Sequence, residues 1–169
     1  MVHLLRPVYS TWEMEWRLEE ELNYTDDYIE LMRLRSEEPI LITRNIQNVD
    51  SDIRVPRFIL QPLLENCFMH GVRSGCPFNI ELSAEQTEQA VLLKVTDNGS
   101  GIPPDTLLAI RAALDAISRG ETVDRFIGMC NVHRRLRLYL GENSGLDIES
   151  TVAEGTVITV RLASSETKV

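Results

Sequence analysis

The stretch that decides the fold is Val55–Val72, with the sequence VPRFILQPLLENCFMHGV. Its apolar residues recur at the helical period, so they predict a core-facing stripe on one side of a helix: Ile59, Leu60, Leu63, Leu64 and Cys67. Pro56 suits the first turn of such a helix, and Gly71 suits its C-terminal end. Pro62 removes one backbone hydrogen bond, which predicts a kink just before Glu65.

The opposite side of this expected helix is mostly polar. It carries Gln61, Glu65, Asn66, Met69, His70 and Arg73. Asn66, His70 and Arg73 follow one another at i, i+4 and i+7, so their side chains share one ridge. Polar helix faces are usually only solvated, and this stretch alone favours that interpretation. The motifs further along the chain favour a reactive surface instead.

Composition indicates one globular domain. The chain has 169 residues, of which 43% are hydrophobic and 25% charged, and this length suits a single core. No apolar run approaches the roughly 20 residues that cross a bilayer, and no signal-peptide pattern opens the chain. We therefore expect a soluble segment.

Charge and cysteine usage exclude several classes of partner. The net charge of −9 repels phosphate backbones, so we expect no nucleic-acid partner, although a local pocket can still hold a nucleotide. The three cysteines show no CxxC spacing, and the three histidines lie far apart in sequence. This pattern fits a reducing cytosol and predicts neither a disulfide framework nor a structural metal site.

Helices and strands are expected to be interleaved along the rest of the chain. The acidic residues Glu19–Glu21 open the first helix and complement its dipole. In order we expect a helix at 18–35, a strand at 40–46, a hairpin of 78–83 with 90–96, a helix at 105–118, a mobile segment at 119–126, a helix at 128–140 and a hairpin of 146–151 with 156–162. The pattern predicts an α+β fold, a two-layer α/β sandwich whose mixed, mostly antiparallel sheet carries helices on one face.

Three glycine-containing motifs can contact a ligand. Asp97–Gly101 (DNGSG) ends a strand, where glycines allow close backbone approach and the aspartate can accept from an exocyclic amine such as that of adenine. Gly128 opens a helix whose free N–H groups attract anions. Glu154–Thr156 (EGT) is a hairpin turn with a hydroxyl to offer. Singly, each is also ordinary turn or helix-start chemistry.

Together the four stretches resemble the motifs of sensor histidine kinases. Leu60–Asn66 (LQPLLEN) with the following His-Gly resembles the N box, Asp97–Gly101 the first glycine box, Gly128–Val132 the second and Glu154–Thr156 the last. The LQPL wording, with LEEEL and YIE upstream, is similar to the LytS/YehU type, and the resemblance runs over residues 4–162. It implies the Bergerat ATP-binding fold of the GHKL superfamily.

The resemblance also implies roles for single residues. Glu65 and Asn66 would be catalytic, Glu65 by deprotonating or orienting an acceptor histidine and Asn66 by holding Mg²⁺ against the phosphates. Asp97 would hold the adenine amine, and residues 119–126 would form a lid over ATP. The implied ATP-binding set is Asn66, His70, Arg73, Asp97, Gly99, Gly101, Ile102, Gly128, Met129 and Thr156.

Three positions depart from the family pattern. Met69 stands where a lysine is frequent, so one cation for the phosphates is missing, and Arg73 or Arg125 would compensate. Phe126 stands where many kinases have the first glycine of the second box, which narrows or stiffens the lid hinge. Arg134 replaces a frequent acidic residue.

The resemblance divides the chain into three parts. Residues 1–35 would end a dimerisation and phosphoacceptor segment with its connecting helix, residues 36–163 would form the histidine kinase-like ATPase domain, and residues 164–169 would be a frayed tail. The chain has no Pro-His-Phe motif, so we expect the phosphoacceptor histidine outside it, with His3 a weaker candidate. The parent is expected to be a membrane-bound homodimer of the inner membrane, with this domain cytoplasmic and a response regulator as its partner.

Three hypotheses follow for the function. The leading one is an ATP-dependent protein-histidine kinase of a two-component phosphorelay. Met69 and Phe126 leave open a degenerate, non-catalytic nucleotide-binding module of the same fold. A third hypothesis is an ATP-hydrolysing relative of the Hsp90 or MutL kind.

Overall fold

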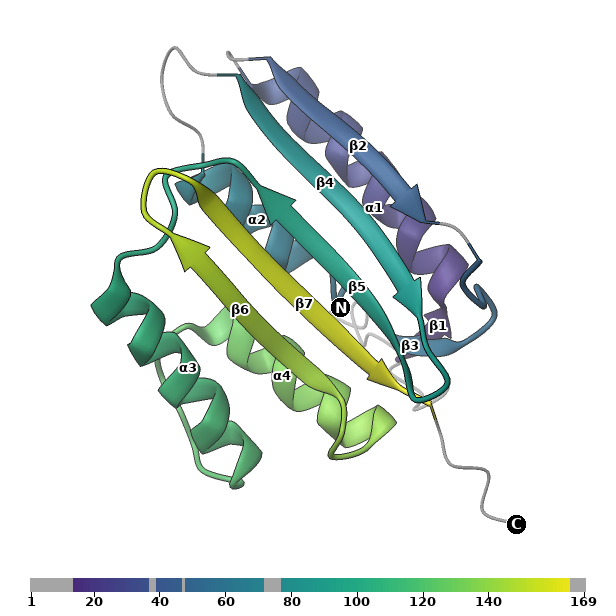
Figure 1. Ribbon diagram of the computed structural model, residues 1–169. Coiled ribbons are helices and arrows are strands. Elements are labelled where there is room, and N and C mark those ends of the chain that lie inside the picture. The colour runs from purple at the N-terminus through teal and green to yellow at the C-terminus, as the bar shows by residue number, and fades with distance from the viewer. Residues whose placement is uncertain (1–13, 37–38, 47, 72–76, 165–169) are drawn as a thin grey trace, which may run out of the picture.

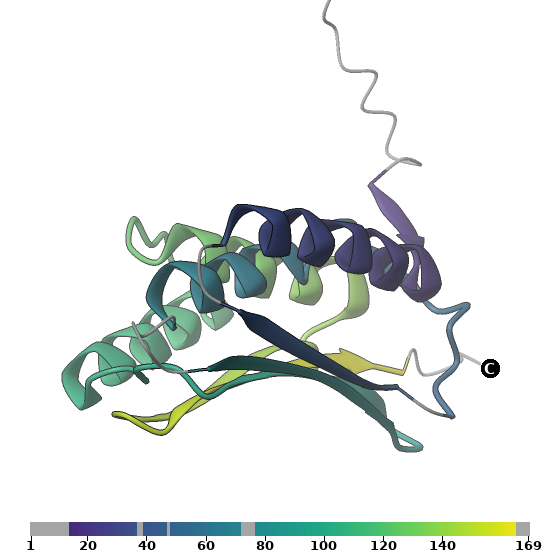
Figure 2. The same cartoon turned by 90° about the horizontal axis from the view of Figure 1, so that it is seen from above.

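A five-stranded sheet carries four helices on one face, and a two-stranded sheet lies beside them (Figures 1 and 2). This computed structural model describes residues 14–36, 39–46, 48–71 and 77–164, and the counts refer to those ranges. Figure 2 shows the helices together on one side of the sheet, as a second layer. The predicted α+β sandwich is therefore confirmed.

The large sheet is mixed and mostly antiparallel. Its strand order is β2-β4-β5-β7-β6, formed by Ile40–Ile46, Phe78–Gln86, Ala90–Asp97, Gly155–Ala163 and Gly145–Thr151. Only β2 and β4 pair in parallel, and the other three pairings are antiparallel. Both predicted hairpins are present, and their register places the end of β5 beside the start of β7.

The four helices are α1 (Leu18–Arg35), α2 (Gln61–His70), α3 (Pro104–Ser118) and α4 (Ile127–Leu140). For α1, α3 and α4 the predicted bounds hold to within one residue. The core lies between the helices and the sheet. Each helix turns its apolar side towards that space, and each strand turns every second residue towards it. Helix α1 shares this core, and the division of the chain at residue 35 stays a prediction.

The central stretch differs from the prediction at its N-terminal end. Arg54–Pro56 forms strand β3, which pairs antiparallel with β1 (Glu15–Arg17), so Pro56 does not open the helix. Helix α2 begins only at Gln61, which puts Pro62 in the first turn, where its missing N–H costs nothing. The predicted kink before Glu65 is therefore wrong. A pairing between segments about 40 residues apart leaves no local signal in the sequence.

The predicted stripe on the same stretch is confirmed. All five residues are buried in the core: Ile59, Leu60, Leu63, Leu64 and Cys67. Gly71 ends the helix as expected, but its φ of −85° is open to any residue. Glycine is needed there because a Cβ would lie 2.6 Å from the ring of Phe78.

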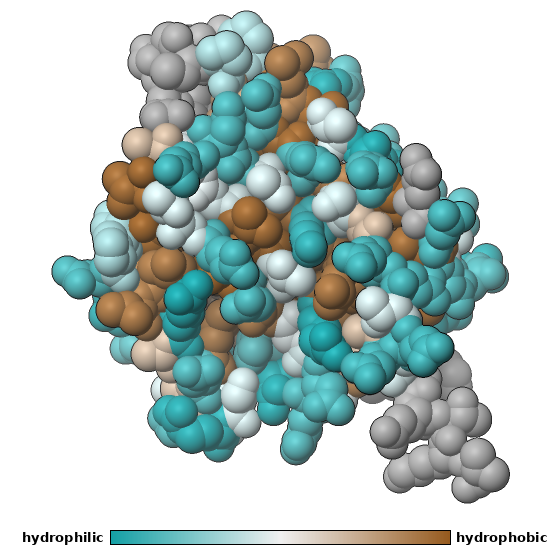
Figure 3. Space-filling model, in the orientation of Figure 1, coloured by the Kyte–Doolittle hydropathy of each residue, from teal (hydrophilic) through white to brown (hydrophobic). Residues whose placement is uncertain are grey.

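The outer face of the sheet is largely hydrophilic (Figure 3). Its exposed residues include Glu81, Asp147, Glu149 and Arg161, which alternate with buried neighbours along their strands. Within the described ranges, no helix is both long and apolar enough to cross a membrane. His3, Arg73, Cys76, the predicted turn at 74–77 except Pro77, and the tail beyond Ser164 lie outside those ranges.

Candidate functional site

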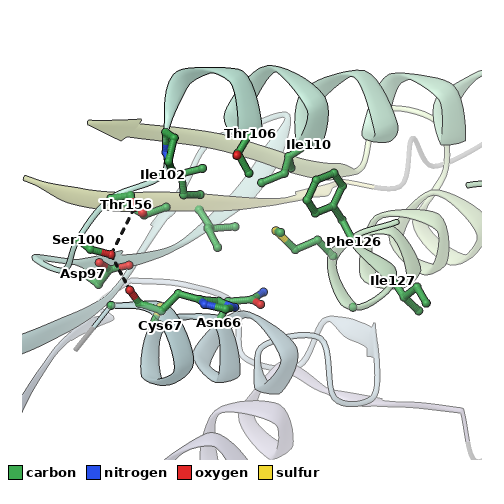
Figure 4. A pocket seen from close by; sticks show the side chains of 17 residues that line it. Asn66, Cys67, Asp97, Ser100, Ile102, Thr106, Ile110, Phe126, Ile127 and Thr156 are labelled. Atoms are coloured by element: carbon green, nitrogen blue, oxygen red, sulfur yellow. Dashed lines mark hydrogen bonds between the residues drawn. The ribbon is translucent and has the colours of Figure 1, made fainter. Parts of the chain in front are cut away.

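A cavity of about 620 Å³ opens between α2, α3, the start of α4 and the ends of β5 and β7 (Figure 4). Its volume falls in the range of small-molecule sites. The lining includes eight residues expected from the motifs: Asn66, His70, Asp97, Gly101, Ile102, Gly128, Met129 and Thr156. Glu65 and Gly99 are not among its lining residues. The motifs therefore converge on one space.

Asp97 is the principal polar group at one end of this cavity. It ends β5, is only 7% exposed, and its Oδ1 accepts the Gly99 N–H at 2.8 Å. Burial raises the pKa of Asp97 above its usual value, while the N–H of Gly99, the thiol of Cys67 and the N–H of Thr156 act in the opposite direction. Burial likewise raises the pKa of the Cys67 thiol, so this thiol is a neutral donor to Asp97. The result is a buried carboxylate, still able to accept a hydrogen bond from a ligand in the cavity.

Two glycines with positive φ let backbone segments pass close to one another at this end of the cavity. Gly155 has a φ of 128°, and a Cβ there would collide with the carbonyl oxygen of Asp97. Gly101 has a φ of 67°, and a Cβ there would collide with the carbonyl oxygen of Thr151. Both contacts are backbone against backbone, so no rotamer change can relieve them. Glycine is therefore required at both positions for the cavity wall to close.

The loop after Asp97 also holds the C-terminal end of α2. Gly99 lies directly against the backbone of Gly71, and Ser100 Oγ donates to the carbonyl of His70 at 2.6 Å. These contacts explain why Gly99 matters without lining the cavity. They fix helix α2 relative to strand β5.

Ser150 is a site residue that the motifs did not reveal. Its Oγ donates to the carbonyl of Gly155 at 2.8 Å, accepts from the N–H of Ile102 at 2.8 Å, and lies 2.9 Å from Oγ1 of Thr156. Because its own proton goes to Gly155, the hydroxyl of Thr156 is the donor between the two. The only sequence signal was its place opposite Thr156 in the predicted hairpin.

The start of α4 forms the opposite end of the cavity. Figure 4 shows Phe126 and Ile127 across the cavity from Asp97 and Ser100. The first N–H groups of a helix lack partners within that helix and carry the positive end of its dipole, so residues 127–129 offer an anion site. Phe126 has a φ of 52°, in the left-handed region that glycine adopts most readily. This backbone conformation explains why the family pattern has a glycine at this position. In this chain the position carries Phe126, whose ring lines the cavity.

Asn66 lies between these two ends on helix α2, with its side chain towards the cavity (Figure 4). In the part of the chain that the structure describes, no group of three histidine, cysteine or acidic side chains could hold a metal ion. A single amide oxygen nevertheless fits Mg²⁺, which commonly takes one or two protein ligands and completes its shell with phosphates and water. The donor set is compatible with Mg²⁺ only when a phosphorylated ligand brings the remaining oxygens.

Glu65 faces helix α1. Its Oε1 accepts from Nε2 of Gln61 at 2.8 Å, and Oε1 of Gln61 accepts from the hydroxyl of Tyr24 at 3.0 Å. Burial and then the charge of Glu65 raise the pKa of Tyr28. Met69 is 76% exposed, so the lysine expected from the family pattern would also project into solvent. The proton-accepting role of Glu65 stays a prediction.

The segment 119–126, expected to be a lid, joins α3 to α4 without regular secondary structure. Arg119 forms an exposed ion pair with Glu121 at 2.6 Å, and the guanidinium of Arg125 lies 5.1 Å from the centroid of the Phe126 ring. Exposed pairs of this kind contribute little to stability. The apolar contacts of Val123 and Phe126 with the core hold the segment more firmly than this ion pair does.

These features define a class of protein. It is an α/β sandwich with a mixed, mostly antiparallel sheet, and its cavity has a buried carboxylate at a strand end, glycine loops beside it and a helix start across from it. Residues 51–166 match the family of histidine kinase-, DNA gyrase B- and HSP90-like ATPases, and the chain belongs to that family.

Several proteins similar to the chain are sensor proteins or sensor histidine kinases. The chain is 29% identical to the sensor protein LytS of Bacillus subtilis (strain 168), over 89% of this chain and 25% of LytS. It is 29% identical to the sensor histidine kinase YesM of the same organism, over 86% of this chain and 23% of YesM. The chain thus spans about a quarter of the length of these relatives. The resemblance drawn from the motifs is confirmed.

Among solved structures, the chain is similar to the catalytic domain of the histidine kinase ThkA. The TM-score is 0.61 at 14% identity, over 88% of this chain and 93% of that domain. At 14% identity, this similarity is evidence for a shared fold alone. It agrees with the sandwich described above.

Proposed function

We propose that the chain is the ATP-binding catalytic domain of a sensor histidine kinase and transfers the γ-phosphate of ATP to a histidine outside the chain. The observation that carries the proposal is the cavity, with Asp97 at one end, the start of α4 at the other and Asn66 between them. Adenine needs an acceptor for its exocyclic amine, and a triphosphate needs N–H donors and cations. The two ends match these needs.

Asp97 and Thr156 would bind adenine. The ionised carboxylate accepts from the exocyclic amine, and the Thr156 hydroxyl, bonded to Ser150, has an oxygen free to accept from a bridging water. Ile102 and Ile110 provide apolar surface for the ring. An apolar wall with a few fixed polar groups is the usual design of such sites.

The helix start and helix α2 would bind the phosphates. The N–H groups of 127–129 act on the anion through the helix dipole, His70 borders the cavity, and Arg73 is the proposed guanidinium. Asn66 would hold Mg²⁺, which when bound neutralises phosphate charge. Phosphoryl transfer depends mainly on such positioning and charge neutralisation.

Glu65 would act on the incoming acceptor histidine. Its carboxylate takes the imidazole proton while the imidazole nitrogen bonds to the γ-phosphorus. The bond from that phosphorus to the β–γ bridging oxygen breaks, and ADP leaves. Because Glu65 faces away from the cavity, it suits a group that arrives from a neighbouring segment better than ATP itself.

The parent protein is proposed to be a membrane-bound homodimer with this domain in the cytoplasm. The acceptor histidine lies on its dimerisation helices, and the phosphate then passes to a response regulator. The names of LytS and YesM, a sensor protein and a sensor histidine kinase, support a sensor kinase as the parent.

Labelled ATP tests the proposal directly. The chain should bind ATP in an Mg²⁺-dependent way and transfer label from the γ-position to a parent protein that includes the upstream helices, giving acid-labile phosphate. The isolated chain should not become labelled. Acid-labile phosphate on the isolated chain would contradict the location of the acceptor.

A degenerate nucleotide-binding module is the second candidate, favoured by exposed Met69 and by the Phe126 ring in the cavity. Tight ATP binding without any transfer to the upstream helices would support it. Steady ATP hydrolysis without transfer would instead indicate an ATPase of the Hsp90 or MutL kind.

A further inference from the structure

Glu21 is a fully buried carboxylate outside the ATP cavity. It lies in the first turn of α1 with 0% of its surface exposed, although an acidic first turn normally faces water. Burial raises its pKa, and hydrogen bonds from its neighbours act in the opposite direction. A buried carboxylate is costly unless its oxygens are well bonded, so its partners indicate why it is there.

The partners of Glu21 come from the segment that leads into helix α2. Its Oε1 accepts the backbone N–H of Leu60 at 2.9 Å, and its Oε2 accepts that of Phe58 at 2.8 Å. Leu60 is the N-cap residue of α2, and Phe58 has a φ of 59°. Glu21 therefore supplies the negative charge that the positive end of α2 requires, and it fixes the turn before that helix.

The third partner of Glu21 comes from the strand before α1. Nε1 of Trp16, in β1, donates to the same Oε2 at 2.7 Å. The guanidinium of Arg57 lies 4.6 Å from the centroid of the Trp16 ring, and the carbonyl of Arg57 accepts from Arg135 of α4 at 2.6 Å. One small cluster thus joins β1 to the two helices, α2 and α4, that contribute Asn66 and Met129 to the cavity.

A second contact joins helix α1 to the start of helix α2. The hydroxyl of Tyr24 in α1 donates to Gln61, the first residue of α2, at 3.0 Å. The rings of Trp16, Tyr24 and Phe58 pack against one another, with centroids 4.8 to 5.7 Å apart. The start of α2 is therefore held from the α1 side by both charge and packing.

We propose that Glu21 is a positioning residue for helix α2, and that through Trp16 it couples nucleotide affinity to the docking of strand β1. The proposal rests on the proposed function, since it takes the cavity to bind ATP. Helix α2 has only ten residues, so a shift at its first turn carries along Asn66. Coupling is reciprocal: if docked β1 favours nucleotide binding, bound nucleotide favours docked β1 by the same free energy.

Tryptophan emission tests the coupling. The chain has two tryptophans, so Trp12→Phe leaves Trp16 as the single reporter. We expect its emission to change on titration with Mg²⁺ and a non-hydrolysable ATP analogue, with the midpoint found by calorimetry. Glu21→Gln keeps the side-chain shape and should weaken affinity about tenfold. Trp16→Phe removes the indole N–H and should weaken it about fivefold.

A matched control separates positioning from general destabilisation. Ser144 is also buried, and its Oγ accepts from Ala163 at 3.0 Å and donates to Leu140 at 3.2 Å. Ser144→Ala should lower thermal stability without changing affinity for the analogue.

The outcomes are distinct. Wild-type chain that does not bind the analogue refutes the proposed function. Wild-type chain that binds, with folded Glu21→Gln and Trp16→Phe variants of unchanged affinity, refutes the positioning role. If Glu21→Gln does not fold, the milder Trp16→Phe variant decides. Silent Trp16 emission during a titration that calorimetry shows to be saturating also overturns the coupling.

Discussion

The two ends of the cavity are held in different ways. At the Asp97 end, backbone contacts of Gly101 and Gly155 and the hydrogen bonds of Ser150 fix the wall before any ligand arrives. At the α4 end, Ile127 is 61% exposed and Phe126 takes a left-handed conformation. The first end is part of what holds the sheet together, and the second is not.

The difference suits the two kinds of ligand group in the proposed function. Adenine is rigid and needs a few polar atoms in fixed positions, which a preformed wall provides at little entropic cost. A triphosphate is flexible and enters and leaves as reaction proceeds, so its end of the site gains from mobility. Substitutions at each end of the cavity test this contrast.

The largest effect on folding is expected from adding a methyl group at the preformed end. Gly155→Ala combines a positive φ with a collision against the Asp97 carbonyl, so it should lower the free energy of unfolding by about 3 kcal/mol. At the other end, a Cβ on Gly128 would meet only Pro62, at 3.7 Å. Gly128→Ala should change stability by less than about 0.5 kcal/mol. Urea denaturation measures both, and equal losses would remove the contrast.

The largest effect on binding is expected from Asp97→Asn. The amide replaces an acceptor by a donor where the adenine amine is proposed to bind, so affinity for ATP and adenosine should both fall about 100-fold. In the wild type, affinity should fall as pH drops and Asp97 takes up a proton, at a higher pH than for an ordinary aspartate because its pKa is raised. Calorimetry over a pH series measures this. Unchanged adenosine affinity in the variant would show that adenine does not bind at Asp97.

Unlike Ile127 at the start of α4, His133 further along this helix is buried. This buried imidazole accepts the Leu146 N–H at its Nδ1 and contacts Ser118 Oγ through Nε2, both at 2.9 Å. Burial, assisted by Arg137, lowers the pKa of His133 to about 4.

The unfolded chain binds this proton near pH 6.5, so the stabilising contribution of His133 is complete above that pH and is lost between about pH 6.5 and 4. The loss should reach about 2 kcal/mol, allowing for partial solvation. His133→Gln should remove this component from the stability profile of the wild type. Identical pH profiles for the two proteins would show that the imidazole does not titrate as described.

At the phosphate end, Asn66→Ala should weaken binding of ATP about tenfold with Mg²⁺ present, and less than about twofold without it. The reason is that, in the proposed site, Asn66 contributes one ligand to the ion and little to the nucleotide directly. Titrations with and without a chelator measure the difference. A loss of equal size under both conditions would make Asn66 a direct ligand of ATP.

The smallest effect is expected from Met69→Lys, which restores the cation frequent in the family. Since this position is 76% exposed, the added charge should raise affinity for Mg²⁺-ATP only about threefold and leave adenosine binding unchanged. Competition binding with the two ligands checks it. A large gain, or any gain for adenosine, would place this side chain closer to the nucleotide than the structure indicates.

The sequence predicted those parts of the fold that depend on local periodicity. Helix α1, both hairpins and the buried side of α2 follow from the spacing of apolar residues. The predicted start of α2 was wrong because residues 54–56 pair with residues 15–17. Neither segment shows by itself that the other is its partner. Glu21 was expected only to complement the dipole of α1, and its burial left no sequence signal for the same reason, since its partners Phe58 and Leu60 come from that distant segment.

Site residues were predictable where a glycine motif indicates a special backbone geometry. Such motifs contain Gly101, Gly128 and Asp97, and all three line the cavity. Ser150 was not predicted, because a serine in a strand indicates no site until its pairing with Thr156 is known. The bond between Glu65 and Gln61 is an i, i+4 contact within α2, whereas the bond of Gln61 to Tyr24 of α1 depends on the packing of two helices and left no sequence signal.

The most direct test of the account compares amide resonances of the chain with adenosine and with Mg²⁺ plus a non-hydrolysable ATP analogue. Adenosine should shift the N–H signals of Gly99, Gly101 and Thr156 and leave those of residues 127–129 unchanged, whereas the analogue should shift both groups. A chain in which adenosine shifts residues 127–129 but not Gly99 or Gly101, or in which neither ligand shifts either group, would contradict the assignment of adenine to one end of the cavity and phosphates to the other.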